Sequence, residues 1–155
     1  MKLEAPSLRT TRRHALAIGA GLGAWVLVRP AEAATDDLAA AIGAFAGGAN
    51  VNAGKVRLDV APLVENGNTV PITVSVESPM TAADHVKAIA IFNERNPQRD
   101  VASFALGPRS GHALVSTRIR LATSQKLVAV ALMSDGSAWS HTVDVIVTLA
   151  ACVES

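Results

Sequence analysis

The sequence is poor in cysteine and in aromatic residues. Among 155 residues there is one cysteine, no tyrosine, three phenylalanines and two tryptophans. So few aromatic side chains argue against a base-stacking platform or an aromatic carbohydrate-binding surface. A single cysteine has no intramolecular partner, so no internal disulfide stabilises the fold. The formal net charge is only +1, and nothing in the sequence indicates nucleic-acid binding.

An export signal is indicated at the amino terminus. Arg12 and Arg13 precede an apolar stretch of about 14 residues, and Ala31-Glu32-Ala33 has the pattern of a cleavage site. The stretch is shorter than the ~20 residues that span a bilayer, which argues against a membrane anchor. The arginine pair predicts export to the periplasm by the twin-arginine route. Removal of residues 1–33 leaves one domain of about 122 residues, in which nine basic and eleven acidic residues give a formal charge of −2.

A short helix is expected at the start of this domain. It would lie between Thr35, which can serve as N-cap, and Gly47, which can stop it. Leu38, Ile42 and Phe45 then form an apolar stripe along one face. We expect this stripe to pack on the protein's own domain; a partner surface is the alternative.

From residue 55 onward, apolar and polar residues alternate with the period of half-buried strands. The pair Asn66-Gly67 favours a type I′ hairpin between the first two strands. Short strands separated by Gly-, Pro- and Asn-containing turns predict an all-β fold over residues 34–149, an immunoglobulin-like antiparallel β-sandwich preceded by one short N-terminal helix. An up-and-down barrel is the alternative. The expected strands cover residues 56–60, 70–76, 86–92, 101–106, 113–121, 126–133 and 139–149.

The sequence shows no catalytic or metal-binding constellation. The dipeptide Asp84-His85 pairs a carboxylate with an imidazole, but neighbouring residues of a strand face opposite sides of a sheet. His112 and His141 lie on predicted strands without the short shared spacing of zinc ligands. Arg118 and Arg120 share one strand face, which fits a solvated face better than an anion-binding stripe. We therefore predict no catalytic residue, no metal site and no cofactor.

The only cysteine is Cys152, on a short tail of residues 150–155. This position argues against a role as core filler. Leu149-Ala150-Ala151-Cys152 matches a lipobox, but lipoboxes act at the end of an amino-terminal signal. Cys152-Val153-Glu154-Ser155 is similar to a prenylation box, but Glu154 is not aliphatic. The remaining interpretation is a covalent handle for a sulfur-containing substrate, since accessible thiolates form disulfide-type adducts. Two such tails are also expected to form a Cys152–Cys152 disulfide dimer.

Six short stretches of the sequence resemble motifs of a known protein family. They occur in the same order as in the family and cover nearly the whole chain after the signal. Together with the twin-arginine signal and the terminal cysteine, they make the chain resemble the SoxY family, the periplasmic sulfur carrier subunit of the thiosulfate-oxidising Sox system. The stretches are Glu65–Pro71, Ser78–Thr81, Asn96-Pro97, Ser116–Ala122, Ser134–Ser137 and Val145–Thr148.

The resemblance implies an immunoglobulin-like sandwich that forms a heterodimer with a second small β protein, SoxZ. It implies that Cys152 is the site of covalent sulfur attachment and carries thiosulfate or sulfur species derived from it. A c-type cytochrome enzyme would load the arm, a hydrolase would release sulfate, and a sulfane dehydrogenase would oxidise the remaining sulfur. The carrier itself would not be an enzyme.

The arm departs from the family pattern, which typically ends Gly-Gly-Cys-Gly-Gly. Here Ala150-Ala151 precede the cysteine, and Val153 after it is β-branched and stiff, whereas glycine reaches positive φ freely. Glu154 and the terminal carboxylate place negative charge near the sulfur, which disfavours the thiolate.

Three functions stay open: a sulfur carrier with an altered arm, a non-carrier binding or structural paralogue that keeps the SoxZ-type partner interface, and an independent enzyme. The last would need a second catalytic group near Cys152.

Overall fold

The computed structural model describes residues 33–151. This part of the chain contains one α-helix, α2 (Ala33–Phe45), nine β-strands and the short 3-10 helix η1 (Pro108–Ser110). The predicted export signal lies outside the described residues except for Ala33, and so do Cys152 and the residues after it.

Helix α2 ends where the sequence predicted. Gly47 and Gly48 have φ values of 63° and 81°, which glycine adopts without steric cost. Their N–H groups donate to the carbonyls of Ala44 (3.2 Å) and Gly43 (3.1 Å), the paired hydrogen bonds of a Schellman motif. The prediction that Thr35 is the N-cap is wrong, because this residue lies inside the helix. The two alanines before it are strong helix formers and extend the helix toward the amino terminus.

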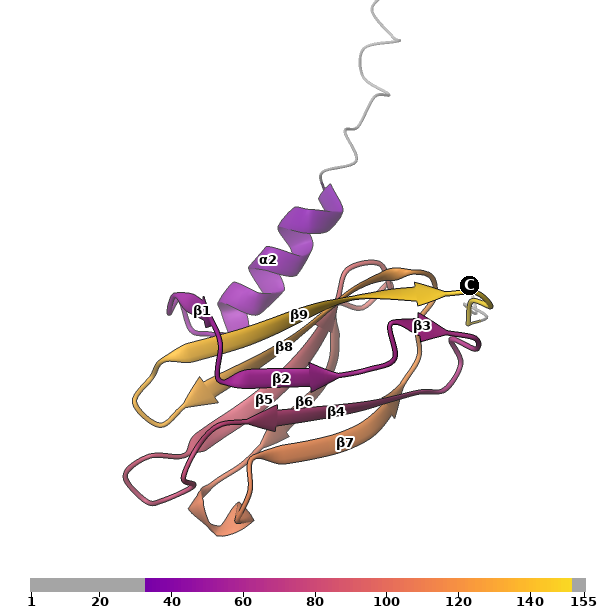
Figure 1. The fold of residues 1–155 in the computed structure, drawn as a ribbon. Helices are drawn as coiled ribbons and strands as arrows, with labels where there is room; N and C mark the ends of the chain where they lie inside the picture. Colours follow the sequence, from indigo (N-terminus) through magenta and orange to yellow (C-terminus); the bar gives the residue numbers. More distant parts are fainter. Residues whose placement is uncertain (1–32, 152–155) are drawn as a thin grey trace, which may run out of the picture. The chain divides into compact units, whose positions relative to one another are not determined.

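The strands form two sheets that pack face to face (Figure 1). The larger sheet has the order β1-β9-β8-β5-β6, with β3 also paired to β9, and the smaller has the order β2-β4-β7. The pairs are antiparallel except that β1 and β3 run parallel to β9. This is the all-β, immunoglobulin-like sandwich that the sequence predicted. The bounds are β1 Val51–Ala53, β2 Val56–Asp59, β3 Leu63–Val64, β4 Val70–Val76, β5 Val86–Asn93, β6 Asp100–Ala105, β7 Leu114–Ile119, β8 Gln125–Met133 and β9 Ala138–Val147.

The connection between β3 and β4 differs from the prediction. Strand β3 pairs with β9, whereas β4 pairs with β2 and β7, so Asn66-Gly67 carries the chain from one sheet to the other. The predicted type I′ hairpin is therefore wrong. A type I′ turn needs positive φ at both central residues, and neither Asn66 nor Gly67 has one.

The core lies between the sheets. The small sheet contributes Ile72 and Val74, and the large sheet contributes Ile89, Ile91 and Leu127, none more than 3% exposed. These are the alternating apolar positions that the period of two predicted. Removing such a side chain from water favours folding by about 1.5–3 kcal/mol.

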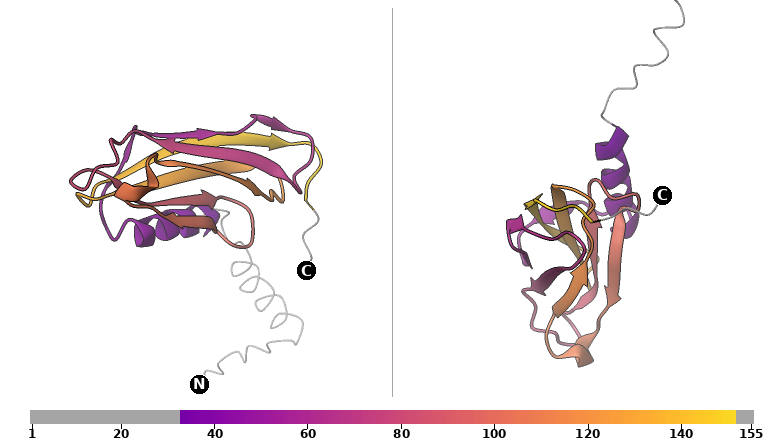
Figure 2. Two further views of the ribbon diagram at one scale, coloured as in Figure 1. Left: turned by 90° about the horizontal axis from the view of Figure 1, so that it is seen from below. Right: turned by 90° about the vertical axis from the view of Figure 1, so that its right-hand side faces the viewer.

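Helix α2 covers part of the outer face of the large sheet, as the stripe predicted, and Figure 2 shows it lying along that side. Leu38 is 8% exposed and belongs to a second apolar cluster with Phe92 of β5 and Val128 of β8. The rings of Phe45 and Phe92 meet edge to face at 5.9 Å, a geometry worth about 0.5–1.5 kcal/mol beyond burial.

Candidate functional site: the base of the C-terminal arm

Cys152, the expected site of covalent sulfur attachment, lies outside the described residues. The described chain ends one residue earlier, at Ala151. Ala150 is exposed, but Ala151 is only 7% exposed. The structure thus defines the base of the arm, at the end of the sandwich where β9 finishes beside β3 (Figure 1).

At this end, two backbone hydrogen bonds join the base of the arm to two turns, and a third joins the turns to each other. Gly67 donates its N–H to the carbonyl of Leu149 (2.8 Å) and accepts the N–H of Leu121 (2.8 Å). Ala151 in turn donates its N–H to the carbonyl of Leu121 (3.1 Å). The backbone N–H and C=O groups of Gly67 and Leu121 therefore all take part in one continuous hydrogen-bond network. This network also contains Leu149 and Ala151.

Only glycine fits at position 67. A Cβ there would lie impossibly close to the carbonyl oxygen of Leu121, 2.9 Å from the nitrogen of Ala151 and 3.1 Å from Cγ1 of Val147. Leu121 is fully buried, with 0% exposure, so it is held in place by the core. The absence of a side chain at Gly67 thus allows three segments to approach one another closely.

The end of β9 is held on both sides before it reaches this point. Ile146 donates its N–H to the carbonyl of Pro62 (2.9 Å), and Thr148 donates its N–H to the carbonyl of Val64 (3.0 Å). On the other side, the N–H of Val147 donates to Oγ of Ser124 (2.9 Å). The arm therefore leaves the sandwich from a fixed strand end.

A side-chain amide holds the turn that carries Leu121. Nδ2 of Asn96 donates to the carbonyl of Arg120 (2.9 Å), and its Oδ1 accepts the N–H of Ala122 (3.0 Å). Oδ1 also accepts a hydrogen bond from Nε2 of Gln125 (2.7 Å). Gln125 is buried, with 5% exposure. Asn96 thus fixes the backbone on both sides of Leu121. The motif Asn96-Pro97 was noticed in the sequence, but its contact with residues 120–122 depends on the fold.

Three large apolar side chains are exposed near the same end. Leu63 and Ile146 are partners in the register of β3 and β9, and Leu149 follows at the base of the arm. They are 57%, 59% and 63% exposed. Exposed apolar groups that gather in one place are typical of surfaces that contact another molecule.

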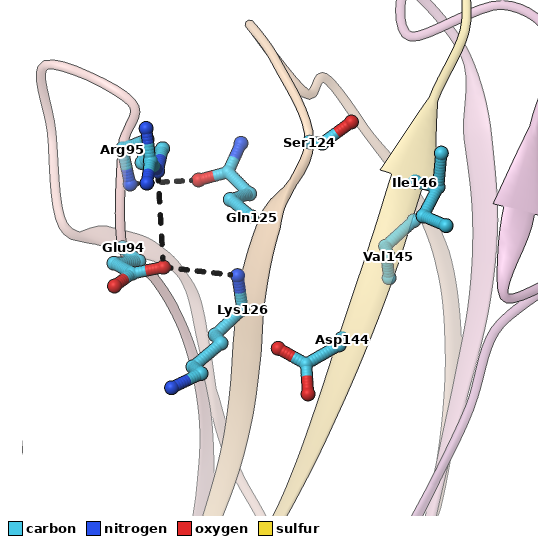
Figure 3. Close-up of a pocket in the computed structure, with 8 residues that line it drawn as sticks. All are labelled: Glu94, Arg95, Ser124, Gln125, Lys126, Asp144, Val145 and Ile146. Atoms are coloured by element: carbon cyan, nitrogen blue, oxygen red, sulfur yellow. Dashed lines mark hydrogen bonds and ion pairs between the residues drawn. The ribbon is translucent and has the colours of Figure 1, made fainter.

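A groove of about 360 Å³ lies beside this end, on the outer face of the large sheet (Figure 3). Its charged side chains are Glu94, Arg95, Lys126 and Asp144. Glu94 lies 3.9 Å from Arg95, and Lys126 and Asp144 face each other in the strand register. The two positive groups are thus matched by two negative ones, and the groove does not select for an anion.

The dipeptide Asp84-His85 has a structural role. The N–H of Asp84 donates to Oγ1 of Thr81 (3.1 Å), and Nδ1 of His85 lies 3.1 Å from the carbonyl oxygen of Thr81. Both residues lie in the turn before β5 and not on a strand, and Asp84 takes part through its backbone. The prediction that His112 lies on a strand is wrong, because it lies in the loop before β7. Arg118 and Arg120 are both exposed, as expected for a solvated face, although Arg120 lies just beyond the end of β7.

Within residues 33–151, no group of three or more His, Cys, Asp or Glu side chains is arranged to hold a metal ion. In the same part of the chain, no helix has both the length and the apolar character needed to cross a membrane.

Comparison with known proteins identifies the family. Residues 42–152 match the sulfur oxidation protein SoxY. The chain belongs to the SoxY family. The sulfur carrier protein SoxY from Chlorobium limicola f thiosulfatophilum has a similar structure, with a TM-score of 0.63 and 30% sequence identity over 74% of this chain and 99% of that chain. No match was found among curated protein sequences.

More distant structures share only the fold. The superoxide reductase (neelaredoxin) from Ignicoccus hospitalis matches with a TM-score of 0.54 and 19% identity, over 61% of this chain and 80% of that one. The superoxide reductase from Nanoarchaeum equitans matches with a TM-score of 0.53 and 12% identity, over 62% of this chain and all of the other. At such low identity, their activity does not transfer to this member of the SoxY family.

Proposed function

We propose that this member of the SoxY family is a periplasmic sulfur carrier, which holds thiosulfate-derived intermediates on Cys152 while partner enzymes act on them. The observation that carries the proposal is the family match, which extends to residue 152 and so includes the cysteine. The similar Chlorobium protein is itself a sulfur carrier.

The proposed loading step is an oxidation. The thiol of Cys152 and the outer sulfur of thiosulfate join in an S–S bond, and one proton and an electron pair leave. A c-type cytochrome enzyme is the proposed electron acceptor. A hydrolase would then add water at the sulfonate group, which releases sulfate and leaves a persulfide on Cys152. A sulfane dehydrogenase, with water as oxygen source and its own electron acceptor, would oxidise this remaining sulfur. The chain supplies the attachment point and no catalytic group.

The structure supports a carrier in two ways. The end of β9 is fixed by hydrogen bonds from Ile146 and Thr148, so the tail that follows has a rigid base. Exposed apolar side chains near this base offer a surface to a partner protein. We propose a heterodimer with a SoxZ-like β protein, and export by the twin-arginine route with removal of residues 1–33.

Intact-mass measurement tests the proposal. The protein with its SoxZ-like partner is exposed to thiosulfate and the loading enzyme, and we expect the neutral mass to increase by one S2O3 unit, because the adduct keeps one hydrogen on its sulfonate in place of the thiol hydrogen. The gain should be lost in Cys152→Ser and on treatment with dithiothreitol. A homologue with a Gly-Gly-Cys-Gly-Gly arm serves as positive control. A wild-type chain that stays unmodified while this homologue is loaded would contradict the proposal.

A second candidate is favoured by the arm itself. With alanines before Cys152 and Val153 after it, the tail is stiffer than an arm of glycines. The chain would then be a paralogue that keeps the SoxZ-type interface without carrying sulfur. Loading of the wild type distinguishes the two candidates. If the wild type is not loaded, replacing Ala150, Ala151 and Val153 by glycine locates the cause: gained loading places the defect in the arm, and continued absence of loading places it in the body of the protein.

A further inference from the structure

Within residues 33–151, the last backbone hydrogen bond to the sandwich is made by Ala151, one residue before the cysteine. Ala151 is buried and donates its N–H to Leu121. This hydrogen bond therefore anchors the chain at the residue that directly precedes the cysteine. A free arm beginning at residue 150 would not be restricted in this way.

We propose that Gly67 is a positioning residue for Cys152. Its N–H holds residue 149, its carbonyl holds Leu121, and its missing side chain leaves the space in which Ala151 reaches Leu121. We call this arrangement of Gly67, Leu121, Leu149 and Ala151 the arm clamp. This inference rests on the proposed function, because it takes Cys152 to be the group that needs positioning. The arm clamp itself is tested without any sulfur loading.

A methyl group at position 67 should displace the arm. It would overlap backbone atoms of both Leu121 and Ala151. Leu121 has 0% exposure and is held by the core, whereas Ala151 is near the carboxyl terminus and is held at its N–H by one hydrogen bond. The weaker of the two contacts gives way, so Gly67→Ala should release the segment that leads to Cys152.

Proline at position 151 tests the same clamp from the other side. Ala151→Pro removes the N–H that donates to Leu121 and leaves every residue of the sandwich unchanged. Ala150→Pro is its matched control, since the described residues offer no acceptor for the N–H of Ala150. Gly43→Ala is the matched control for Gly67→Ala, because a Cβ at Gly43 meets nothing within 4 Å.

The experiment uses the single cysteine as a labelling site. A nitroxide is attached to Cys152 in each variant, and its electron paramagnetic resonance line shape reports local motion. We expect a slow component in the wild type, Gly43→Ala and Ala150→Pro, and its loss in Gly67→Ala and Ala151→Pro. Amide hydrogen exchange in unlabelled protein should show the Gly67 N–H roughly tenfold faster in Ala151→Pro, the effect expected from losing the support of about one hydrogen bond.

Several outcomes overturn the clamp. A fast line shape in the wild type, or the same line shape in all five proteins, shows that position 67 does not position the cysteine. A lower melting temperature in Gly67→Ala with an unchanged line shape shows a purely structural glycine. If Gly67→Ala does not fold, Ala151→Pro alone decides. A clamped but never loaded wild type would instead contradict the proposed function and leave the clamp standing.

Discussion

Nδ1 of His141 accepts a hydrogen bond from the backbone N–H of Leu58 at 3.0 Å. His141 lies on β9 of the large sheet and Leu58 on β2 of the small sheet, so this bond joins the two layers at the side of the sandwich. Leu58 is 3% exposed, so its N–H has little access to water. The histidine that the sequence left without a role thus satisfies a buried backbone donor.

Replacing His141 should weaken the sandwich. His141→Phe keeps a ring of similar shape but removes the acceptor, and we expect the free energy of unfolding to fall by about 1–2 kcal/mol because the Leu58 N–H is left unpaired. Denaturant unfolding measures the change. His112→Phe, at an exposed loop position, is the control and should leave stability nearly unchanged. Equal effects of the two substitutions would argue against the bond between the sheets.

Asn96 should stabilise the turn that supports the arm. Asn96→Ala removes the hydrogen bonds to Arg120, Ala122 and Gln125, and we expect a loss of about 2 kcal/mol. Amide hydrogen exchange should speed up at residues 121 and 122 in this variant. Gln98→Ala, at an exposed position of the same loop, should change neither quantity. Unchanged exchange at residue 122 in Asn96→Ala would show that this side chain does not hold the turn.

A pH-dependent contribution comes from Asp135, in the turn between β8 and β9. Hydrogen bonds from the hydroxyl (2.7 Å) and backbone N–H (2.8 Å) of Ser137 favour its ionised form and lower its pKa, and Lys55 adds to the effect. Because the folded-state pKa is lowered, this contribution to stability is present above the ordinary aspartate pKa and is lost as pH falls through the lowered value.

Ser137→Ala removes the largest of these causes. We expect the pKa of Asp135 to rise toward its ordinary value in this variant, measured by NMR titration of the side-chain carboxyl carbon. Ser103→Ala, at an exposed position of β6, is the control. A pKa of Asp135 that is the same in both variants would contradict the assignment to the Ser137 hydroxyl.

The exposed apolar residues near the arm should matter for loading. An enzyme that reacts with a sulfur one residue beyond Ala151 must approach the end of the sandwich closely, and so must pass near Ile146 and Leu149. We expect Ile146→Ser to raise the KM for loading about tenfold, because buried apolar contact is lost, without a change in melting temperature. Leu114→Ser, on β7 and 56% exposed in the wild type, is the control. Equal KM values for the two variants would contradict a role of Ile146 in binding the loading enzyme.

The sequence predicted the sandwich well because its strands alternate. Positions such as Ile72 and Val74 repeat with a period of two and are buried as expected, and the glycine stop of α2 follows from local backbone preferences. Strand β3 was missed because its two residues, Leu63 and Val64, are too few to show a period. Its pairing with β9 is a long-range contact, which local pattern does not reveal.

The role of Gly67 was also hidden from the sequence. An Asn-Gly pair most simply indicates a hairpin turn, a local property. In the structure the glycine is needed for close approach to Leu121 and Ala151, residues far away along the chain. By contrast, the assignment of Cys152 depends on family resemblance and on its place in the tail, and both could be seen before the fold was known.

The most direct test of the central claim is to locate the added sulfur. After exposure to thiosulfate and the loading enzyme, together with a Gly-Gly-Cys-Gly-Gly homologue in the same tube, both carboxyl-terminal peptides are analysed by tandem mass spectrometry. We predict that Cys152 carries a thiosulfate adduct that dithiothreitol removes. An unmodified Cys152 beside a fully loaded homologue would contradict the account.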